Sequence, residues 1–177
     1  MADTNIHRWS SLAESVEPPS WTKRNELIGS LIPDNVSVLD IGCGNGDLKR
    51  FIPPNVKYCG LDCVGIPCDH KIILDFNMTN VYDLSLPIKY DYIICSGVLE
   101  YIQNPNTFIR FISQNGKNII LSYALHENRP IIEYSHLNGW VNDLPRRLLM
   151  DIFADHCLSP IIETKFENQT VFVLTSA

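Results

Sequence analysis

The chain has 177 residues, 45% of them hydrophobic, and a formal net charge of −6. That length suits one domain with a sizeable core. The negative charge argues against general electrostatic binding to nucleic acid or to an anionic membrane. Because the N-terminus lacks a secretion signal and no apolar run approaches membrane-spanning length, we expect a cytoplasmic protein with no membrane partner.

Residues 1–20 are polar and end in Pro18-Pro19, which predicts a flexible arm ahead of one domain at 21–177. The domain opens with a helix over 21–31, for which Ser20 is the predicted N-cap. Apolar runs and amphipathic spacing predict the later elements. Strands are expected at 36–41, 56–62, 71–75, 90–95 and 118–123, helices at 47–52, 106–113 and 145–156, and an antiparallel pair at 160–166 and 170–174. This order predicts an α/β fold with a doubly wound, mostly parallel seven-stranded sheet and a C-terminal antiparallel hairpin.

A glycine-rich loop, Asp40-Ile-Gly-Cys-Gly-Asn-Gly46, follows the first strand. Glycine permits positive φ and has no Cβ, so the backbone can pass close to a bound ligand. The next helix start offers unpaired N–H groups to a polar or anionic group. A dinucleotide fingerprint would read G-x-G-x-x-G. This loop instead reads D-x-G-x-G-x-G, and its carboxylate suits an ammonium group better than a pyrophosphate. A Walker A loop is excluded because no Gly-Lys-Ser/Thr follows.

Acidic residues end the next two strands, and the motifs occur in a characteristic order. Asp62 ends the second strand and Asp75 the third, while the fourth runs into Cys95 and Ser96. Over about residues 36–125 the chain resembles the class I, Rossmann-like S-adenosylmethionine-dependent methyltransferases. The matching segments are VLDIGCGNG (38–46), YCGLD (58–62), ILDFN (73–77) and YDYIICSGVLEYI (90–102).

The resemblance implies S-adenosyl-L-methionine as the cofactor and gives roles to residues near its methionine end. Asp40 would interact with the ammonium group of the methionine moiety, directly or through water. Cys95 and Ser96 would line the methionine end through backbone groups. The loop residues that would let the backbone approach the cofactor are Gly42, Cys43, Gly44 and Gly46.

The adenosine end has its own implied contacts. Asp62 would bind both ribose hydroxyls, and Leu61 or Cys63 would pack near the adenine. Asp75 would accept a hydrogen bond from the adenine amino group, and the Phe76 backbone would reach a ring nitrogen. Residues 63–70 depart from the family, because they are too few for the usual helical crossover between parallel strands. We expect either a loop that leaves the adenine side open or a third strand that begins later.

Catalytic residues are harder to locate from the sequence. Methyl transfer from a sulfonium is an in-line displacement that depends on holding the acceptor near the methyl carbon. An oxygen acceptor would also benefit from a general base. His126, directly after the fifth strand, is the preferred base, and Tyr101 stands where family members often carry histidine in Leu-Glu-His-Ile. The polar loop 134–142 contains His136 and also Trp140, which either covers the substrate or anchors the next helix.

The six cysteines raise the question of disulfides or metal. Cys59, Cys63, Cys68 and His70 form the one group worth testing as a zinc site, but their spacing fits no common zinc pattern. We therefore expect reduced cysteines that serve as small apolar residues, and no bound metal.

Three interpretations follow. The leading one is an S-adenosylmethionine-dependent methyltransferase that acts on a small-molecule or glycan acceptor. The second is a non-catalytic protein that binds S-adenosylmethionine or a partner on the same fold. The third, a nucleotide-sugar or dinucleotide enzyme, is disfavoured by the glycine spacing.

Overall fold

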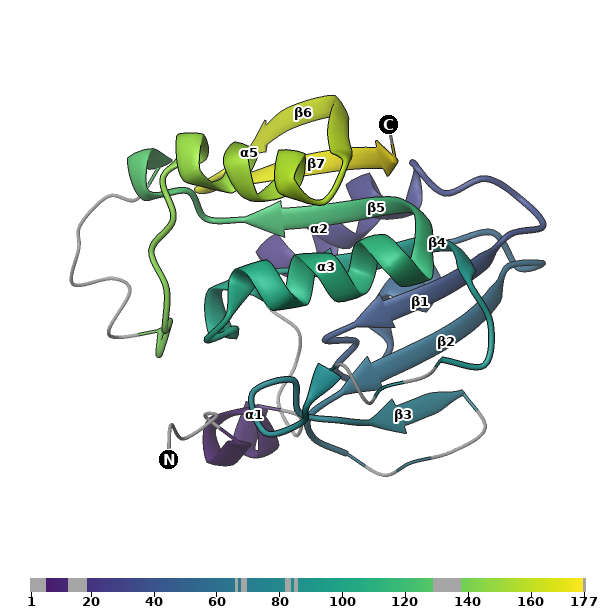
Figure 1. Cartoon of the computed structure of the whole chain (residues 1–177). Coiled ribbons are helices and arrows are strands. Elements are labelled where there is room, and N and C mark those ends of the chain that lie inside the picture. The colour runs from purple at the N-terminus through teal and green to yellow at the C-terminus, as the bar shows by residue number, and fades with distance from the viewer. Residues whose placement is uncertain are drawn as a thin grey trace.

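The computed structural model describes residues 6–12, 19–65, 67, 70–81, 84, 86–128 and 138–176. It contains a seven-stranded sheet in the order β3-β2-β1-β4-β5-β7-β6 (Figure 1). The strands are β1 Ser37–Ile41, β2 Lys57–Asp62, β3 Lys71–Ile73, β4 Tyr90–Ser96, β5 Gly116–Tyr123, β6 Leu158–Phe166 and β7 Gln169–Ser176. The α-helices are α1 Ile6–Leu12, α2 Pro19–Gly29, α3 Pro105–Asn115 and α5 Arg146–Asp155, and the 3-10 helices are η1 Asp47–Arg50, η3 Leu99–Tyr101 and η4 His126–Asn128. The predicted α/β architecture with its C-terminal hairpin is confirmed.

The strand order reverses between β1 and β4, and such a switch point in a continuous sheet can receive a ligand. β1 pairs in parallel with β2 and with β4, β2 with β3, and β4 with β5. β7 runs antiparallel to both β5 and β6. β2 and β3 therefore lie on one side of β1, and β4 lies on its other side. Connections leave the carboxyl ends of β1 and β4 in opposite directions at this switch point, where open α/β sheets bind ligands.

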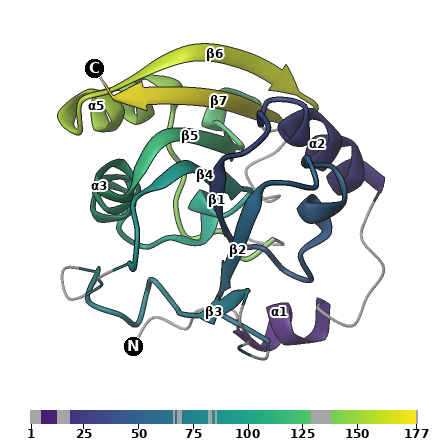
Figure 2. The same cartoon turned by 90° about the vertical axis from the view of Figure 1, so that its right-hand side faces the viewer.

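Helices cover both faces of the sheet, with α3 and α5 on one side and α2 on the other (Figure 2). On the α3 side, Phe108 and Phe153 are almost completely buried. On the α2 side, Ile28 packs in the same cluster as Val38 of β1. Burying each such side chain contributes about 1.5–3 kcal/mol. The packed sheet is thus a stable frame for the residues that follow its strand ends.

Some elements differ in length from the prediction. β3 ends at Ile73, so Asp75 lies in the segment after the strand. The helix expected at 47–52 is reduced to the four-residue η1. The described residues between β2 and β3 form bends and a turn without a helix, which confirms the predicted loop. Residues 6–12 of the predicted arm form α1, and the flexibility of that arm stays a prediction.

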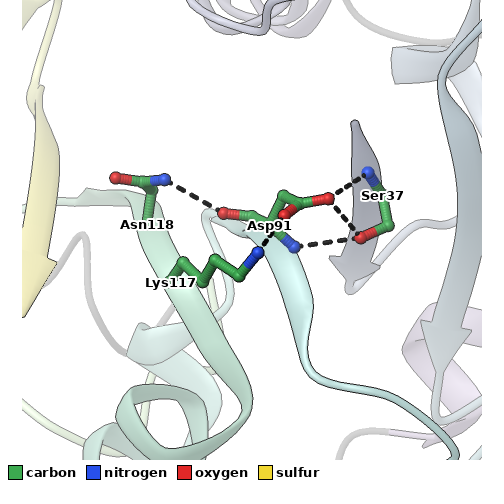
Figure 3. A network of polar contacts seen from close by, with 4 residues as sticks. All are labelled: Ser37, Asp91, Lys117 and Asn118. Carbon is green, nitrogen blue, oxygen red and sulfur yellow. Dashed lines mark hydrogen bonds and ion pairs between the residues drawn. The ribbon is translucent and has the colours of Figure 1, made fainter. Parts of the chain in front are cut away.

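A polar network joins the amino ends of β1, β4 and β5, at the edge of the sheet opposite the switch point (Figure 3). The Asp91 carboxylate accepts hydrogen bonds from the Ser37 N–H at 2.9 Å and the Ser37 hydroxyl at 2.8 Å. It also accepts one from the Lys117 ammonium at 2.7 Å. The bond from Lys117, followed by those from Ser37, lowers the pKa of Asp91 below its usual 3.8. The network therefore stabilises the fold fully at pH values above 3.8, and this stabilisation is lost as the pH falls through the lowered pKa of Asp91.

We expect Asp91→Ala to lower the free energy of unfolding by about 1–3 kcal/mol at pH 7, because Ser37 and Lys117 lose a shared acceptor. Urea unfolding measures this difference, which should shrink below about pH 4, because Asp91 is then protonated in the unfolded chain while it is still ionised in the folded one. An equally large difference on both sides of that pH would contradict the assigned role of the carboxylate.

The structure contains no transmembrane-length apolar helix within its described ranges. Cys43, Cys59, Cys63, Cys95 and Cys157 are unpaired thiols. No cluster of three or more metal-ligating side chains occurs in the described part of the chain. Cys68, from the group considered for zinc, lies outside the described residues.

Candidate functional site

A cavity of about 340 Å³ lies where the carboxyl ends of β1, β2 and β4 meet the segment after β3. Many of the residues predicted to bind the cofactor or to act in catalysis contribute to its wall. They are Asp40, Gly42, Cys43, Gly44, Asp62, Cys63, Asp75, Phe76, Ser96 and Tyr101. Gly46, Cys95 and His126 are not among the described residues that line this cavity.

The glycine loop has the conformation for which glycine is required. Gly42, Gly44 and Gly46 have φ values of +75°, +53° and +80°. A Cβ on Gly42 would come within 2.2 Å of Val98 Cγ2. A side chain at this position would therefore clash with Val98, the residue before η3. A Cβ on Gly44 would have no protein atom within 4 Å. Gly44 therefore presents bare backbone to open space at the cavity wall.

Asp62 and Lys71 hold this loop from two sides. Asp62 Oδ2 accepts a hydrogen bond from the Gly44 N–H at 2.7 Å, and its Oδ1 accepts one from the Val64 N–H at 3.2 Å. The Lys71 ammonium donates to the Gly44 carbonyl at 2.7 Å. Each carboxylate oxygen has a second lone pair, so Asp62 can fix the loop and still accept hydrogen bonds from a ligand.

Asp40 is a buried acid at the end of β1. Its side chain is 3% exposed, and its Oδ2 accepts a hydrogen bond from the Tyr58 hydroxyl at 2.7 Å. Burial raises the pKa of Asp40 to about 7, while the bond from Tyr58 opposes the shift and the negative charge of Asp62 adds to it. Near neutral pH this group is divided between its two protonation states. A cation placed beside it would favour the carboxylate form.

Asp75 and Ser96 each present a buried oxygen without a protein partner among the described residues. Asp75 Oδ1 accepts a hydrogen bond from the Asn77 N–H at 2.9 Å, which fixes the carboxylate. Asp75 Oδ2 and Ser96 Oγ have no hydrogen-bond partner although both atoms are buried. Leaving such atoms unsatisfied costs free energy. A ligand that brings an amino group to Asp75 would remove that cost.

Residues 12–159 match the family model described as methyltransferase domain. The chain belongs to this methyltransferase family. The predicted resemblance to class I S-adenosylmethionine-dependent methyltransferases is thereby confirmed, and S-adenosylmethionine is the cofactor that this resemblance predicts.

Two curated relatives are similar in sequence. One is the putative methyltransferase 235L of Invertebrate iridescent virus 6, with 26% identity over 168 residues, which span 89% of this chain and 61% of the relative. The other is the bifunctional methionine biosynthesis protein MetXA/MetW of Rhodopirellula baltica, with 26% identity over 132 residues, which span 64% of this chain and 21% of the relative. The chain thus spans less than two thirds of the length of both relatives.

Solved methyltransferase structures share the fold at low sequence identity. The N-methyltransferase NodS of Bradyrhizobium japonicum WM9, in complex with S-adenosyl-L-homocysteine, has a TM-score of 0.67 and 15% identity, with 98% of each chain covered. The 1,6-didemethyltoxoflavin-N1-methyltransferase of Burkholderia thailandensis, also with S-adenosylhomocysteine, has a TM-score of 0.68 and 12% identity, with 100% of this chain and 92% of that chain covered.

The side chains of this methyltransferase domain fit the cofactor chemically. Asp75 Oδ2 is a buried acceptor that suits an adenine amino group. Asp62 has acceptor capacity for ribose hydroxyls, and Asp40 suits an ammonium group. Burial raises the pKa of both Cys43 and Cys63 to about 12, so these two thiols stay protonated at neutral pH. They can contribute apolar wall rather than charge.

Tyr101 lies in the wall of the same cavity, beside two tryptophans. The Trp140 Nε1–H donates a hydrogen bond to the Tyr101 hydroxyl at 3.0 Å. The Trp9 and Tyr101 ring centroids are 4.7 Å apart, with the planes at 84°. Burial, followed by the charge of Glu100, raises the pKa of Tyr101 to about 12. At neutral pH its hydroxyl is therefore protonated and can donate a hydrogen bond.

A buried network at the β4–β5 side of the cavity was missed by the sequence analysis. Glu100 Oε1 accepts hydrogen bonds from the Ala124 N–H at 2.9 Å and from Gln169 Nε2 at 3.1 Å. Gln169 Oε1 accepts from Arg24 Nη1 at 2.8 Å and from the Ser122 hydroxyl at 3.1 Å. The signal in the sequence was Arg24, which shares the inward face of α2 with Ile28 at a spacing of four residues.

Three predicted residues lie elsewhere. His126 is exposed, and its Nδ1 is 2.8 Å from Asp143 Oδ2. Cys95 is completely buried inside β4, and Gly46 is the residue that precedes η1. His136 lies outside the described residues. The roles predicted for all of these residues stay predictions.

Proposed function

We propose that this domain transfers the methyl group of S-adenosylmethionine to a small-molecule or glycan acceptor. The observation that carries the proposal is the arrangement of Asp40, Asp62 and Asp75 around one glycine loop in one cavity. The three carboxylates lie at or just after the carboxyl ends of adjacent parallel strands, and each matches a different polar part of the cofactor. Among the structural neighbours, the Burkholderia enzyme was solved with 1,6-didemethyltoxoflavin, which supports a small acceptor.

When bound, S-adenosylmethionine would supply an electrophilic methyl group on its sulfonium. The roles we propose for the protein are binding and orientation. Asp62 holds the ribose and the Gly44 backbone together, so the loop and the sugar are fixed relative to each other. Tyr101 donates a hydrogen bond to an acceptor, and the aromatic rings beside it exclude water. Orientation of this kind supplies a large share of the rate in group transfer.

Calorimetric titration with S-adenosylmethionine, S-adenosylhomocysteine and NAD tests the proposal. We expect both S-adenosyl compounds to bind and NAD not to bind. Turnover of methyl-labelled cofactor with a cell extract then separates an enzyme from a non-catalytic binding protein on the same fold. Binding of NAD alone would favour a dinucleotide enzyme. The cytoplasmic location also stays a prediction, supported by the unpaired cysteines.

The affinity for S-adenosylmethionine should depend on pH through Asp40. The cofactor ammonium favours the carboxylate, so binding below pH 7 must release the proton that burial holds on Asp40. Affinity should fall by up to about tenfold for each pH unit below 7. Titrations at pH 5.5, 6.5 and 7.5 measure this slope. Asp40→Asn cannot release a proton and should bind more weakly with a flat profile, whereas an unchanged slope in that variant would remove Asp40 as the cause.

The general base is tested by His126→Ala. Because the ring contacts Asp143 and does not line the described cavity, we expect the variant to keep its kcat. That result would remove His126 as the base. A large loss of kcat in a variant that still folds and binds S-adenosylhomocysteine would instead support it.

A further inference from the structure

Three aromatic side chains form a surface that neither the core nor the cofactor contacts require. We call Trp9, Tyr101 and Trp140 the aromatic wall. Trp9 packs edge-to-face on Tyr101, and Trp140 donates a hydrogen bond to the Tyr101 hydroxyl. The rings come from α1, from η3 and from the segment before α5, which are far apart in the sequence. All three tryptophans of the chain, Trp21 included, line this one cavity.

The aromatic wall is not part of the packing that holds the sheet. Its three side chains are each half-buried, and none belongs to either hydrophobic cluster of the described core. Trp9 also precedes the family match at 12–159, whereas Asp40, Asp62 and Asp75 lie inside it. The cofactor contacts thus belong to the shared domain, and the aromatic wall includes a contribution from outside it. This division is expected if the shared domain binds the cofactor and the aromatic wall recognises the acceptor of this particular protein.

The polar groups of the wall limit what it can bind. The indole N–H of Trp140 already donates to Tyr101, so the wall offers ring surface with the Tyr101 hydroxyl and the Trp9 indole N–H as its donors. Half-buried ring surface next to a cavity favours a partner that makes stacked or edge-to-face contacts. An alkylammonium acceptor would first have to lose its proton, and the protonated Tyr101 hydroxyl cannot take it. An unprotonated nitrogen in an aromatic ring already carries a free lone pair, so it has no such requirement.

We propose that the acceptor carries a flat, uncharged aromatic ring, which the aromatic wall holds beside the cofactor. This inference rests on the proposed methyltransferase function and narrows its acceptor class. Trp9 and Trp140 are then specificity-determining residues. A saturated ring of the same size would fill the same space but would lose the ring–ring contacts.

Matched probes test this in the full chain saturated with S-adenosylhomocysteine. The pairs are catechol with cyclohexane-1,2-diol, and phenol with cyclohexanol, all of them uncharged at neutral pH, and binding is measured by saturation-transfer NMR and calorimetry. We expect the aromatic member of each pair to bind at least about tenfold more tightly. Trp9→Leu and Trp140→Leu should each remove most of that preference. Their affinity for S-adenosylhomocysteine should stay close to that of the unsubstituted chain, which also shows that they fold.

Phe51→Leu is the matched control, because Phe51 is a half-buried aromatic outside the described cavity wall. It should keep the full preference for aromatic probes. Equal binding of aromatic and saturated probes, a preference that survives both tryptophan substitutions, or no probe binding to a cofactor-loaded chain would each overturn the inference. Failure of S-adenosylhomocysteine itself to bind would instead overturn the proposed function, so the two failures are distinguishable.

Discussion

Gly44→Val should abolish binding of S-adenosylhomocysteine and leave a folded protein. Gly44 lines the cavity, and a side chain there would have no protein atom within 4 Å of its Cβ. The isopropyl group would therefore occupy the space through which the cofactor must approach the loop backbone. Its cost to folding comes from the left-handed conformation at φ +53°, which is about 1–2 kcal/mol for a residue other than glycine.

Gly44→Ala separates the two effects, because it also places a Cβ in the left-handed conformation but adds a smaller side chain. We expect both variants to stay folded by thermal unfolding, with somewhat lower stability and much lower affinity in the valine variant. Gly42 is unsuitable for this experiment, since a Cβ there would overlap Val98 and would disturb the fold. A valine variant that binds as tightly as the unsubstituted chain would show that the loop does not contact the cofactor.

Asp62→Ala should weaken cofactor binding by about 1–3 kcal/mol, or roughly 5- to 150-fold, through the loss of charge-assisted hydrogen bonds. The structure adds a second cause. Asp62 also accepts the Gly44 N–H at 2.7 Å, so its removal releases one side of the glycine loop while Lys71 still holds the other. Calorimetry with S-adenosylhomocysteine measures the combined loss.

Two companion variants show where the loss comes from. Asp62→Asn keeps one acceptor oxygen and should lie between alanine and the unsubstituted chain. Asp91→Ala removes a carboxylate at the other end of the parallel strands (Figure 3), and it should change stability without changing affinity. Unchanged affinity in Asp62→Ala would remove the assigned ribose contact.

The sheet and the cofactor residues could be predicted because their signals are local. A buried parallel strand is a short apolar run, and an acid that ends such a run is carried to the same sheet edge as its neighbours. Asp40 and Asp62 were found in this way. Asp75 was found although its strand ends two residues earlier, because the segment after β3 still lies at that edge.

The parts that were missed depend on contacts between distant segments. Gln169 reaches Arg24 across 145 positions, and nothing in the local pattern of either segment indicates the other. The same holds for Trp9, which packs on Tyr101 from a segment read only as a polar arm. His126 does follow β5 as expected, but the chain turns there into η4 and pairs its ring with Asp143.

A crystal structure of the chain grown with S-adenosylhomocysteine tests the central claim most directly. We predict the adenine amino group within hydrogen-bond distance of Asp75 Oδ2 and the ribose hydroxyls on Asp62, with the glycine loop alongside. A nucleoside bound elsewhere, or Asp75 Oδ2 turned to a protein donor while the cavity stays without ligand, would contradict the account.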